Sequence, residues 1–258
     1  MLRFSANLSF LYQEFPFEKR FAQAAADGFK AVEYISPFEL PKNAIAKLLA
    51  DSGLEQALFN MPAGEWDKGE RGIASHPDRV DEFHDGVKLA ADYAQALGCK
   101  QVNCLAGLLP MGVSRETALA TFADNLNHAA AYLKPAGIRV LVEPINRFDM
   151  PSFLINRTAE AMIAMEAAGS DNLFLQADIY HMQRMEGDLT ATLTRLMPRI
   201  AHIQIADNPG RHEPGTGEIN FAFLFKLIKK LGYNGWIGCE YRPLAGTREG
   251  LAWIAANS

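Results

Sequence analysis

The chain has 258 residues, of which 49% are hydrophobic and 21% are charged. This length and this balance fit one large α/β domain with a core that needs no disulfide bonds. The formal net charge of -5 at pH 7 argues against a nucleic-acid partner, because proteins that bind nucleic acid usually carry a basic face. The three cysteines form no paired motif, so neither a disulfide framework nor a structural zinc site is expected.

The first residues, MLRFSANLSFLYQEF, lack the cleavage site of a signal peptide and contain no apolar run of about 20 residues. We therefore expect no membrane partner and a cytoplasmic location. A homo-oligomer is compatible with the sequence, although no decisive surface signature points to one.

Short runs rich in β-branched and aromatic residues, several of them after a glycine turn, predict eight strands. They cover residues 2–7, 29–35, 54–60, 100–106, 138–145, 173–179, 199–206 and 235–241. Apolar residues at three- and four-residue steps predict helices between the strands, most clearly over 79–98. Ser114 and Thr158 are plausible N-caps of two further helices.

Eight such strand–helix units in about 250 residues are typical of a TIM barrel. We therefore predict an α/β protein whose residues 1–258 form a single (β/α)8 domain. An open, doubly wound sheet is the alternative. The first predicted strand is not followed by a GxGxxG motif, which disfavours a dinucleotide-binding fold.

Functional residues of a TIM barrel lie at the carboxyl ends of its strands. The fifth to eighth predicted strands carry Glu143, Asp178, Gln204 and Glu240 to that end. Three carboxylates close together raise one another's pKa, and a buried carboxylate is disfavoured unless it is paired or binds a metal. A divalent cation would remove this conflict. An all-oxygen ligand set suits Mg²⁺ or Mn²⁺ better than Zn²⁺.

Other polar residues are expected at the same end of the barrel. His202 lies two residues before Gln204 on the same strand face; it is either a metal ligand or a residue that supports one. A purely structural role stays open for Gln204. His181 follows the sixth strand, and Arg211 lies in the long loop IADNPGRHEPGTGEI. Arg211 is a candidate clamp for a substrate carboxylate, since a guanidinium binds carboxylates through two parallel hydrogen bonds.

The first half of the chain offers weaker candidates. Four residues stand at ends of predicted strands and could line the site: Asn7, Glu33, Asn60 and Asn103. The polar loop 61–73 follows the third strand and is a candidate lid.

Several long segments carry a family resemblance: LVEPIN, DIYHMQRMEGDL, HIQIADNPGRHEPGTGEIN and GWIGCEY, together with RFSANLSFLYQE and NMPAGEWDKGERGIA. They resemble the hydroxypyruvate isomerase family, within the xylose isomerase-like TIM barrels, over nearly the whole chain. The resemblance implies Glu143 and Glu240 as the acid/base pair. It also implies metal ligation by Glu143, Asp178, Gln204 and Glu240. Sugar epimerases of the wider superfamily usually have a histidine where this chain has Gln204.

The resemblance implies an intramolecular oxidoreductase that interconverts hydroxypyruvate and 2-hydroxy-3-oxopropanoate (tartronate semialdehyde). One of Glu143 and Glu240 would take a proton from C3 and the other would deliver a proton to C2, through a metal-stabilised cis-enediolate. His181 would move a proton between the substrate oxygens, Arg211 would hold the carboxylate, and Asn7 would also bind substrate.

Three alternative functions stay open. A 2-oxo-tetronate isomerase, or a related sugar-acid isomerase or epimerase, uses the same scaffold, although the segment EPINRFDMP looks more like the hydroxypyruvate group. A phosphodiesterase like endonuclease IV is disfavoured by the few histidines at the strand ends and by the negative net charge. A non-catalytic binder of small acids is disfavoured by the pair Glu143 and Glu240, because binding an anion gains nothing from two carboxylates.

Overall fold

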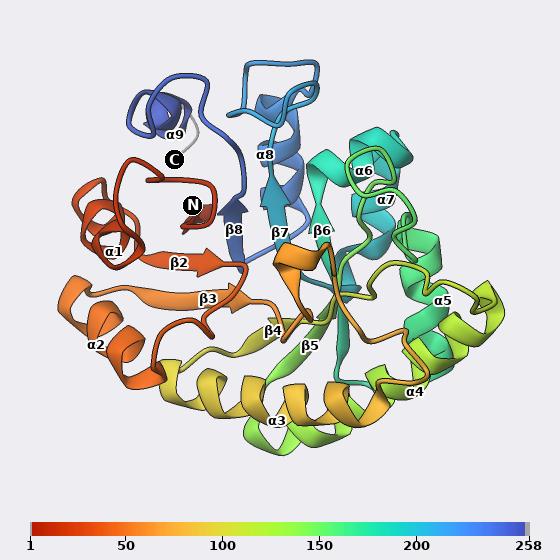
Figure 1. Ribbon diagram of the computed structural model, residues 1–258. Helices are drawn as coiled ribbons and strands as arrows, with labels where there is room; N and C mark the ends of the chain where they lie inside the picture. Colours follow the sequence, from red (N-terminus) through yellow and green to blue (C-terminus); the bar gives the residue numbers. More distant parts are fainter. Residues whose placement is uncertain (1, 256–258) are drawn as a thin grey trace.

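The computed structural model describes residues 2–255 (Figure 1). Its eight parallel strands form one sheet in the order β3-β2-β1-β8-β7-β6-β5-β4. The strands are β1 (Arg3–Asn7), β2 (Ala31–Tyr34), β3 (Glu55–Phe59), β4 (Gln101–Asn103), β5 (Arg139–Val142), β6 (Leu173–Asp178), β7 (Ile200–Ile205) and β8 (Trp236–Cys239). Each lies within a predicted strand. The sheet closes where Asn60 bridges Asn103 and the Met61 N–H donates to the Asn103 carbonyl oxygen at 2.8 Å.

Helices surround this barrel, as Figure 1 shows. The α-helices are α1 (Phe17–Ala26), α2 (Lys42–Ser52), α3 (Val80–Leu97), α4 (Arg115–Leu133), α5 (Thr158–Ala168), α6 (Ile179–Met185), α7 (Leu189–Leu196), α8 (Phe221–Lys230) and α9 (Ala252–Ala255). Short 3₁₀ helices are η1 (Trp66–Lys68), η2 (Lys134–Ala136), η3 (Met197–Arg199) and η4 (Glu249–Leu251). The predicted (β/α)8 barrel is therefore confirmed. The predicted domain 1–258 includes residues 1 and 256–258, which lie outside the described residues.

The two predicted N-caps have different outcomes. Ser114 caps α4, because its hydroxyl oxygen accepts a hydrogen bond from the Thr117 N–H at 3.0 Å. Thr158 is not the N-cap of α5 but its first residue, so that prediction is wrong by one position. The hydroxyl and the N–H of Thr158 both donate to the Glu186 carboxylate, at 2.8 and 2.7 Å. Thr158 therefore uses both groups to bind a residue distant in the sequence instead of capping the helix.

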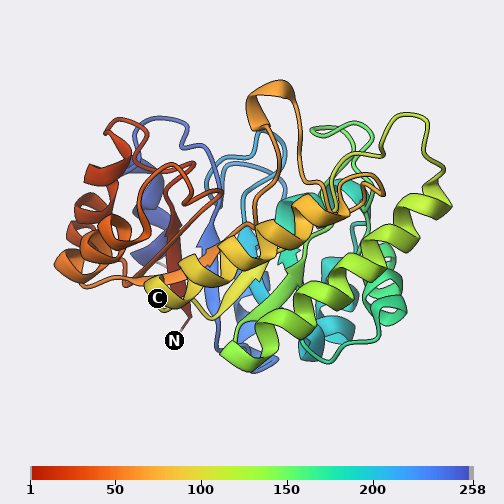
Figure 2. The same cartoon turned by 60° about the horizontal axis from the view of Figure 1, so that its bottom comes forward.

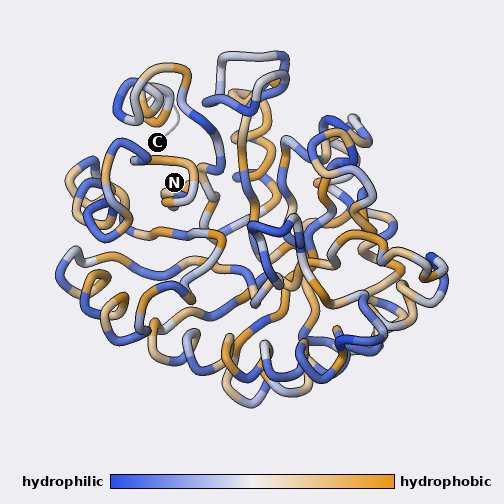
Figure 3. Tube along the Cα trace, viewed as in Figure 1, coloured by the Kyte–Doolittle hydropathy of each residue, from blue (hydrophilic) through white to orange (hydrophobic). Residues whose placement is uncertain are grey.

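The wall of the barrel separates an apolar layer from a polar interior. Side chains alternate along a strand, and the outward ones, such as Val32, Val140 and Ile203, join the main core under the helices. In Figure 3 hydrophobic and hydrophilic residues alternate along the helices, as expected for elements with one buried face. None of the helices between residues 2 and 255 combines the length and the apolar character that crossing a membrane requires.

Glu33 is the centre of the polar interior. Its carboxylate is only 1% exposed and accepts hydrogen bonds from Ser5 Oγ at 2.7 Å, His202 Nε2 at 2.8 Å and Gln204 Nε2 at 2.8 Å. Burial alone would raise the pKa of Glu33, but the nearby His202 and these hydrogen bonds hold that pKa below its usual value. A Cβ atom on Gly238 of β8 would lie 2.2 Å from Glu33 Oε1, so β8 requires a glycine opposite this carboxylate.

We expect Gly238→Ala to destabilise the protein by about 1–3 kcal/mol, because the added methyl group overpacks the buried Glu33 network. The measurement is the midpoint of thermal or urea unfolding. Gly86→Ala is the control: it lies in α3, its Cβ would meet nothing nearer than Pro62 Cγ at 3.4 Å, and alanine favours helix. Equal stability of the two variants would contradict the close packing of Glu33 against β8.

Candidate active site

A cavity of about 840 Å³ opens at the carboxyl end of the barrel. Figure 2 shows the loop after β3, in orange, rising above this end of the strands. The cavity is lined by the strand-end residues Glu143 and Glu240, by His181 and Arg211, and by Trp66 and Arg71 of that loop. Four predicted site residues therefore share one cavity.

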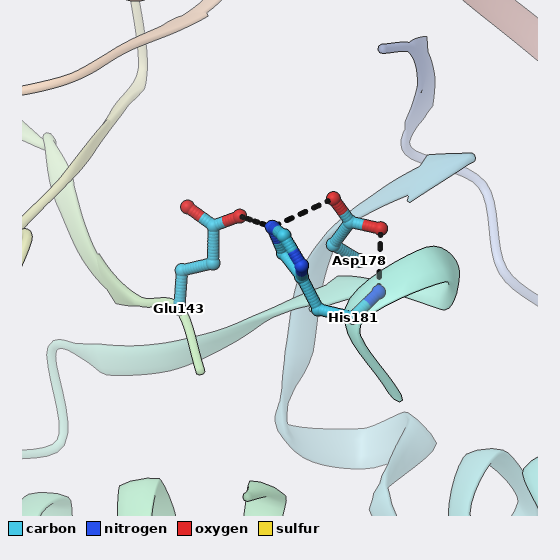
Figure 4. Close-up of side chains that lie close together, drawn as sticks. All are labelled: Glu143, Asp178 and His181. Atoms are coloured by element: carbon cyan, nitrogen blue, oxygen red, sulfur yellow. Dashed lines mark hydrogen bonds and ion pairs between the residues drawn. The ribbon is translucent and has the colours of Figure 1, made fainter. Parts of the chain in front are cut away.

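Glu143, Asp178 and His181 form the closest cluster of this site (Figure 4). Asp178 ends β6 and caps α6, because its Oδ1 accepts hydrogen bonds from the N–H groups of Tyr180 at 2.8 Å and His181 at 3.3 Å. His181 Nε2 lies 3.5 Å from Asp178 Oδ2 and 3.9 Å from Glu143 Oε1. One potential ligand atom from each residue lies within 4.8 Å of the others, so Glu143 and Asp178 are close enough to bind one metal ion.

The contacts of Asn146 determine where His181 carries its proton. Asn146 Oδ1 accepts hydrogen bonds from the N–H groups of Phe148 at 3.0 Å and Asp149 at 2.9 Å. The amide nitrogen of Asn146 therefore faces His181 Nδ1, at 2.7 Å, and donates to it. Burial lowers the pKa of His181 to about 4. His181 is thus neutral, with its proton on Nε2, and it presents a donor to the acids rather than a free lone pair.

Arg211 is the counter-charge of two acids. Its Nη2 lies 3.4 Å from Asp178 Oδ2 and 3.3 Å from Glu240 Oε2. The guanidinium carbon also lies 4.8 Å from the ring centre of Phe10 and 5.1 Å from that of Tyr180. Within residues 2–255, Glu240 Oε2 is buried and makes no hydrogen bond. Charge at Glu240 is therefore only partly compensated.

The two glutamates have raised pKa values. Burial, with the added negative charge of Asp178, raises the pKa of Glu143 to about 8. Burial also raises the pKa of Glu240 well above its usual range, although the charge of Arg211 acts in the opposite direction. A carboxyl group with a pKa of about 8, as at Glu143, can exchange protons near neutral pH, which is the property that general acid–base catalysis needs.

Gln204 and His202 belong to the polar interior below this cluster. Gln204 Nε2 is fixed by Glu33, and its Oε1 accepts a hydrogen bond from Gln176 Nε2 at 2.6 Å. The carbonyl oxygen of Gln204 keeps a second lone pair. Both ring nitrogens of His202 have close partners, Glu33 Oε2 at 2.8 Å and Gln101 Nε2 at 3.3 Å. These contacts favour the supporting role for His202 over ligation.

Two of the asparagines at strand ends, Asn103 and Asn7, contact different glutamates. Asn103 Nδ2 donates to Glu143 Oε2 at 2.8 Å and to Asn60 Oδ1 at 3.2 Å, so it orients Glu143. Asn7 Nδ2 instead faces Glu33 Oε1 at 3.2 Å. Asn7 lines a space of about 20 Å³ inside the barrel rather than the large cavity.

Three residues around His181 were not predicted from the sequence: Asn146, Asp149 and Tyr180. Tyr180 Oη donates to Asp149 Oδ2 at 2.8 Å, and Asp149 Oδ1 accepts a hydrogen bond from Arg184 at 2.8 Å. The available signal was position, because Asn146 and Asp149 follow β5 within a few residues of Glu143 and Tyr180 follows Asp178.

A closed (β/α)8 barrel with acids and a histidine at the ends of β5, β6 and β8 defines the class of this chain. The model of the xylose isomerase-like TIM barrel family matches residues 21–257, and the chain belongs to that family. It is 51% identical over 254 residues to hydroxypyruvate isomerase of Escherichia coli (strain K12), covering 98% of each chain. It is 46% identical over 254 residues to 2-oxo-tetronate isomerase of Cupriavidus necator, again covering 98% of each chain.

A solved structure titled AP endonuclease, family 2, from Brucella melitensis is similar to the whole barrel, with a TM-score of 0.97, 43% identity and 99% coverage of both chains. The 51% and 46% identities to two isomerases show that the chain is a member of the hydroxypyruvate isomerase family and an isomerase. The predicted family and enzyme class are confirmed.

The tautomer of His181 can be tested directly. We expect the wild-type ring to carry its proton on Nε2, and Asn146→Asp to move it to Nδ1, because a carboxylate can only accept a hydrogen bond there. Long-range ¹H–¹⁵N spectra of protein labelled at histidine report the protonated nitrogen. The signal of His181 is the one that His181→Gln removes. An unchanged tautomer in Asn146→Asp would contradict the assignment.

Proposed function

We propose that this isomerase interconverts hydroxypyruvate and 2-hydroxy-3-oxopropanoate. The observation that carries the proposal is the pair Glu143 and Glu240, two buried carboxyl groups with raised pKa values that line one cavity. They follow β5 and β8, strands that are separated by two others in the sheet. The likeness to the Escherichia coli hydroxypyruvate isomerase supports the choice of substrate.

The reaction moves a carbonyl group between neighbouring carbons. One glutamate removes a proton from C3 of hydroxypyruvate, which gives a cis-enediolate, and the other delivers a proton to C2. One C–H bond breaks, one forms, and a proton passes from the C3 oxygen to the C2 oxygen. Positioned acid–base groups of this kind contribute about 10²–10⁴-fold to a rate.

Three neighbours of the glutamates have roles in this scheme. His181 presents its Nε2 proton beside Glu143, so it can give a proton to one substrate oxygen and take one from the other. Asn103 orients Glu143 through its hydrogen bond. Arg211 pairs with Asp178 and Glu240, so we assign it to a substrate oxygen at the reacting carbons and not, as the resemblance implied, to the carboxylate.

The site also fits a divalent cation. Glu240 Oε2 is buried without a hydrogen bond in the described part of the chain, and the acids outnumber the cation beside them. Glu143, Asp178, Gln204 and Glu240 would hold the ion, and their oxygen atoms suit Mg²⁺ or Mn²⁺. Such an ion would stabilise negative charge on the substrate oxygens as a Lewis acid.

A four-carbon substrate is the second candidate. The 46% identity to a 2-oxo-tetronate isomerase supports it, and a cavity of about 840 Å³ has room for one more hydroxymethylene group. An endonuclease, the class named for the Brucella structure, is not favoured, because the acidic cluster found within residues 2–255 contains a single histidine. Assays with both oxo acids separate the two isomerase candidates.

We expect Glu143→Gln and Glu240→Gln each to lower turnover by about 10²–10⁴-fold while the fold is kept, because the amide cannot exchange the proton. Proton NMR in D₂O follows both the product from hydroxypyruvate and deuterium incorporation. Glu166→Gln, on the exposed side of α5, is the matched control. Full activity in either site variant would exclude the two-glutamate scheme, and an inactive wild-type protein would favour the four-carbon substrate or a binder.

Metal removal gives a separate test. We expect EDTA to abolish turnover and Mg²⁺ or Mn²⁺ to restore it, since the carboxylates need a counter-charge. Electron paramagnetic resonance measures Mn²⁺ binding without any turnover, and Asp178→Asn should weaken that binding at least about 10-fold. Glu166→Gln again serves as control. Unchanged turnover in EDTA together with no Mn²⁺ binding would refute the metal site and show that the two glutamates act without a metal.

A further inference from the structure

One half-buried cation that lines the cavity is not neutralised by any acid of residues 2–255. Arg211 already faces Asp178 and Glu240 at 3.4 and 3.3 Å. Arg71, in the loop after β3, lines the same cavity and forms no ion pair with any carboxylate of residues 2–255. A positive side chain without a partner, in a cavity that also holds reactive acids, is a candidate to bind the charged end of a substrate.

The base of the Arg71 loop is fixed to the next loop of the barrel. Gly72 donates its N–H to the Ala63 carbonyl oxygen at 2.9 Å, which closes the loop on itself. A Cβ on Gly72 would lie 2.5 Å from the Leu105 carbonyl oxygen, and one on Gly107 would lie 2.2 Å from the Gly72 carbonyl oxygen. The two backbones touch, so Arg71 stands on a rigid support.

Glu70 is the nearest acid along the chain, but it is occupied elsewhere. Its carboxylate pairs with Arg79, which also binds Glu82 at 2.7 Å, and it accepts a hydrogen bond from the Glu65 N–H at 2.6 Å. Glu70 is therefore bound to Arg79 and to the Glu65 N–H, and Arg71 forms no ion pair with it or with any other acid of residues 2–255.

The guanidinium of Arg71 is oriented with part of its donors free. One nitrogen, Nη1, donates to the carbonyl oxygens of Trp66 at 2.9 Å and Glu70 at 2.6 Å, and the guanidinium carbon lies 4.0 Å from the centre of the Trp66 ring. Nε and Nη2 make no hydrogen bond to any other residue of the described chain. These two nitrogens form the fork that binds a carboxylate through two parallel hydrogen bonds.

We propose that Arg71 binds the carboxylate of the substrate and selects oxo acids over neutral sugars. The proposal rests on the proposed function and extends it. The substrate carboxylate is repelled by Glu143, Asp178 and Glu240, so it must point away from them and towards a free cation. Arg242 also lines the cavity without an ion pair in residues 2–255, but its side chain is exposed, and water weakens an exposed pair.

Glycerate and glycerol test this assignment, because they differ only in the carboxylate and neither contains a carbonyl group to react. We expect Arg71→Gln to weaken glycerate binding, measured by calorimetry, about 10- to 100-fold through loss of a charged fork. Lys68→Gln, the same charge change on the same loop, should leave glycerate binding unchanged. Neither variant should alter the affinity for glycerol. With hydroxypyruvate, Arg71→Gln should raise KM far more than it lowers kcat.

Each other outcome has a distinct meaning. Wild-type affinity for glycerate in Arg71→Gln would overturn the proposal, as would a loss seen in Arg242→Gln instead. If Arg71→Gln does not fold, Arg71→Lys replaces it; about 10-fold weaker glycerate binding is expected, because an ammonium group lacks the fork, and unchanged affinity would overturn the proposal. Glycerate binding that depends on Arg71, in a wild-type protein that does not convert hydroxypyruvate, would refute the proposed function alone.

Discussion

An excess of buried negative charge at the carboxyl end of the barrel governs this structure. Glu143, Asp178 and Glu240 lie at that end, and Arg211 is the one arginine of residues 2–255 that pairs with acids of this group. Removing an ionised carboxylate from water costs several kcal/mol unless partners compensate. The first turn of α6 donates two N–H groups to Asp178, and Asn103 donates to Glu143. Burial, together with the negative charge that remains uncompensated, raises the pKa values of both glutamates, which suits the site to exchange protons or to hold a cation.

The same barrel contains a glutamate in the opposite situation. Glu33 is as deeply buried as Glu240, but four side chains donate hydrogen bonds to it and its pKa is lowered. Glu240 Oε2 has no such donor among residues 2–255, and its pKa is raised. The number of donors thus separates a structural acid from a reactive one. Gln204 joins the two regions, since its amide nitrogen donates to Glu33 and its side chain lines a space of about 20 Å³ together with Glu143 and Glu240.

The sequence predicted what depends on local pattern and chain order. All eight strands, the Ser114 cap and the gathering of Glu143 and Glu240 at one end follow from period-two alternation and from the rule that parallel strands end together. What it missed depends on contacts between distant residues. Thr158 binds Glu186, which lies 28 positions away along the chain. Asn146 donates to His181 Nδ1 from 35 positions away and so determines which ring nitrogen carries the proton. No local pattern encodes such pairs.

The acids of the cavity and the cation Arg71 lie on different elements, and this separation of charge can orient a small, asymmetric substrate. The acids lie at the strand ends, whereas Arg71, which forms no ion pair within residues 2–255, lies in a loop that the backbone contact of Gly72 with Gly107 holds in place. A hydroxy-oxo acid that bound in reverse would bring its carboxylate against three acids, and repulsion of like charges disfavours that pose. A cation held on a supported loop loses less conformational entropy on binding than a mobile one. On this view the orientation of the substrate follows from electrostatics, and the glutamates are left to move protons.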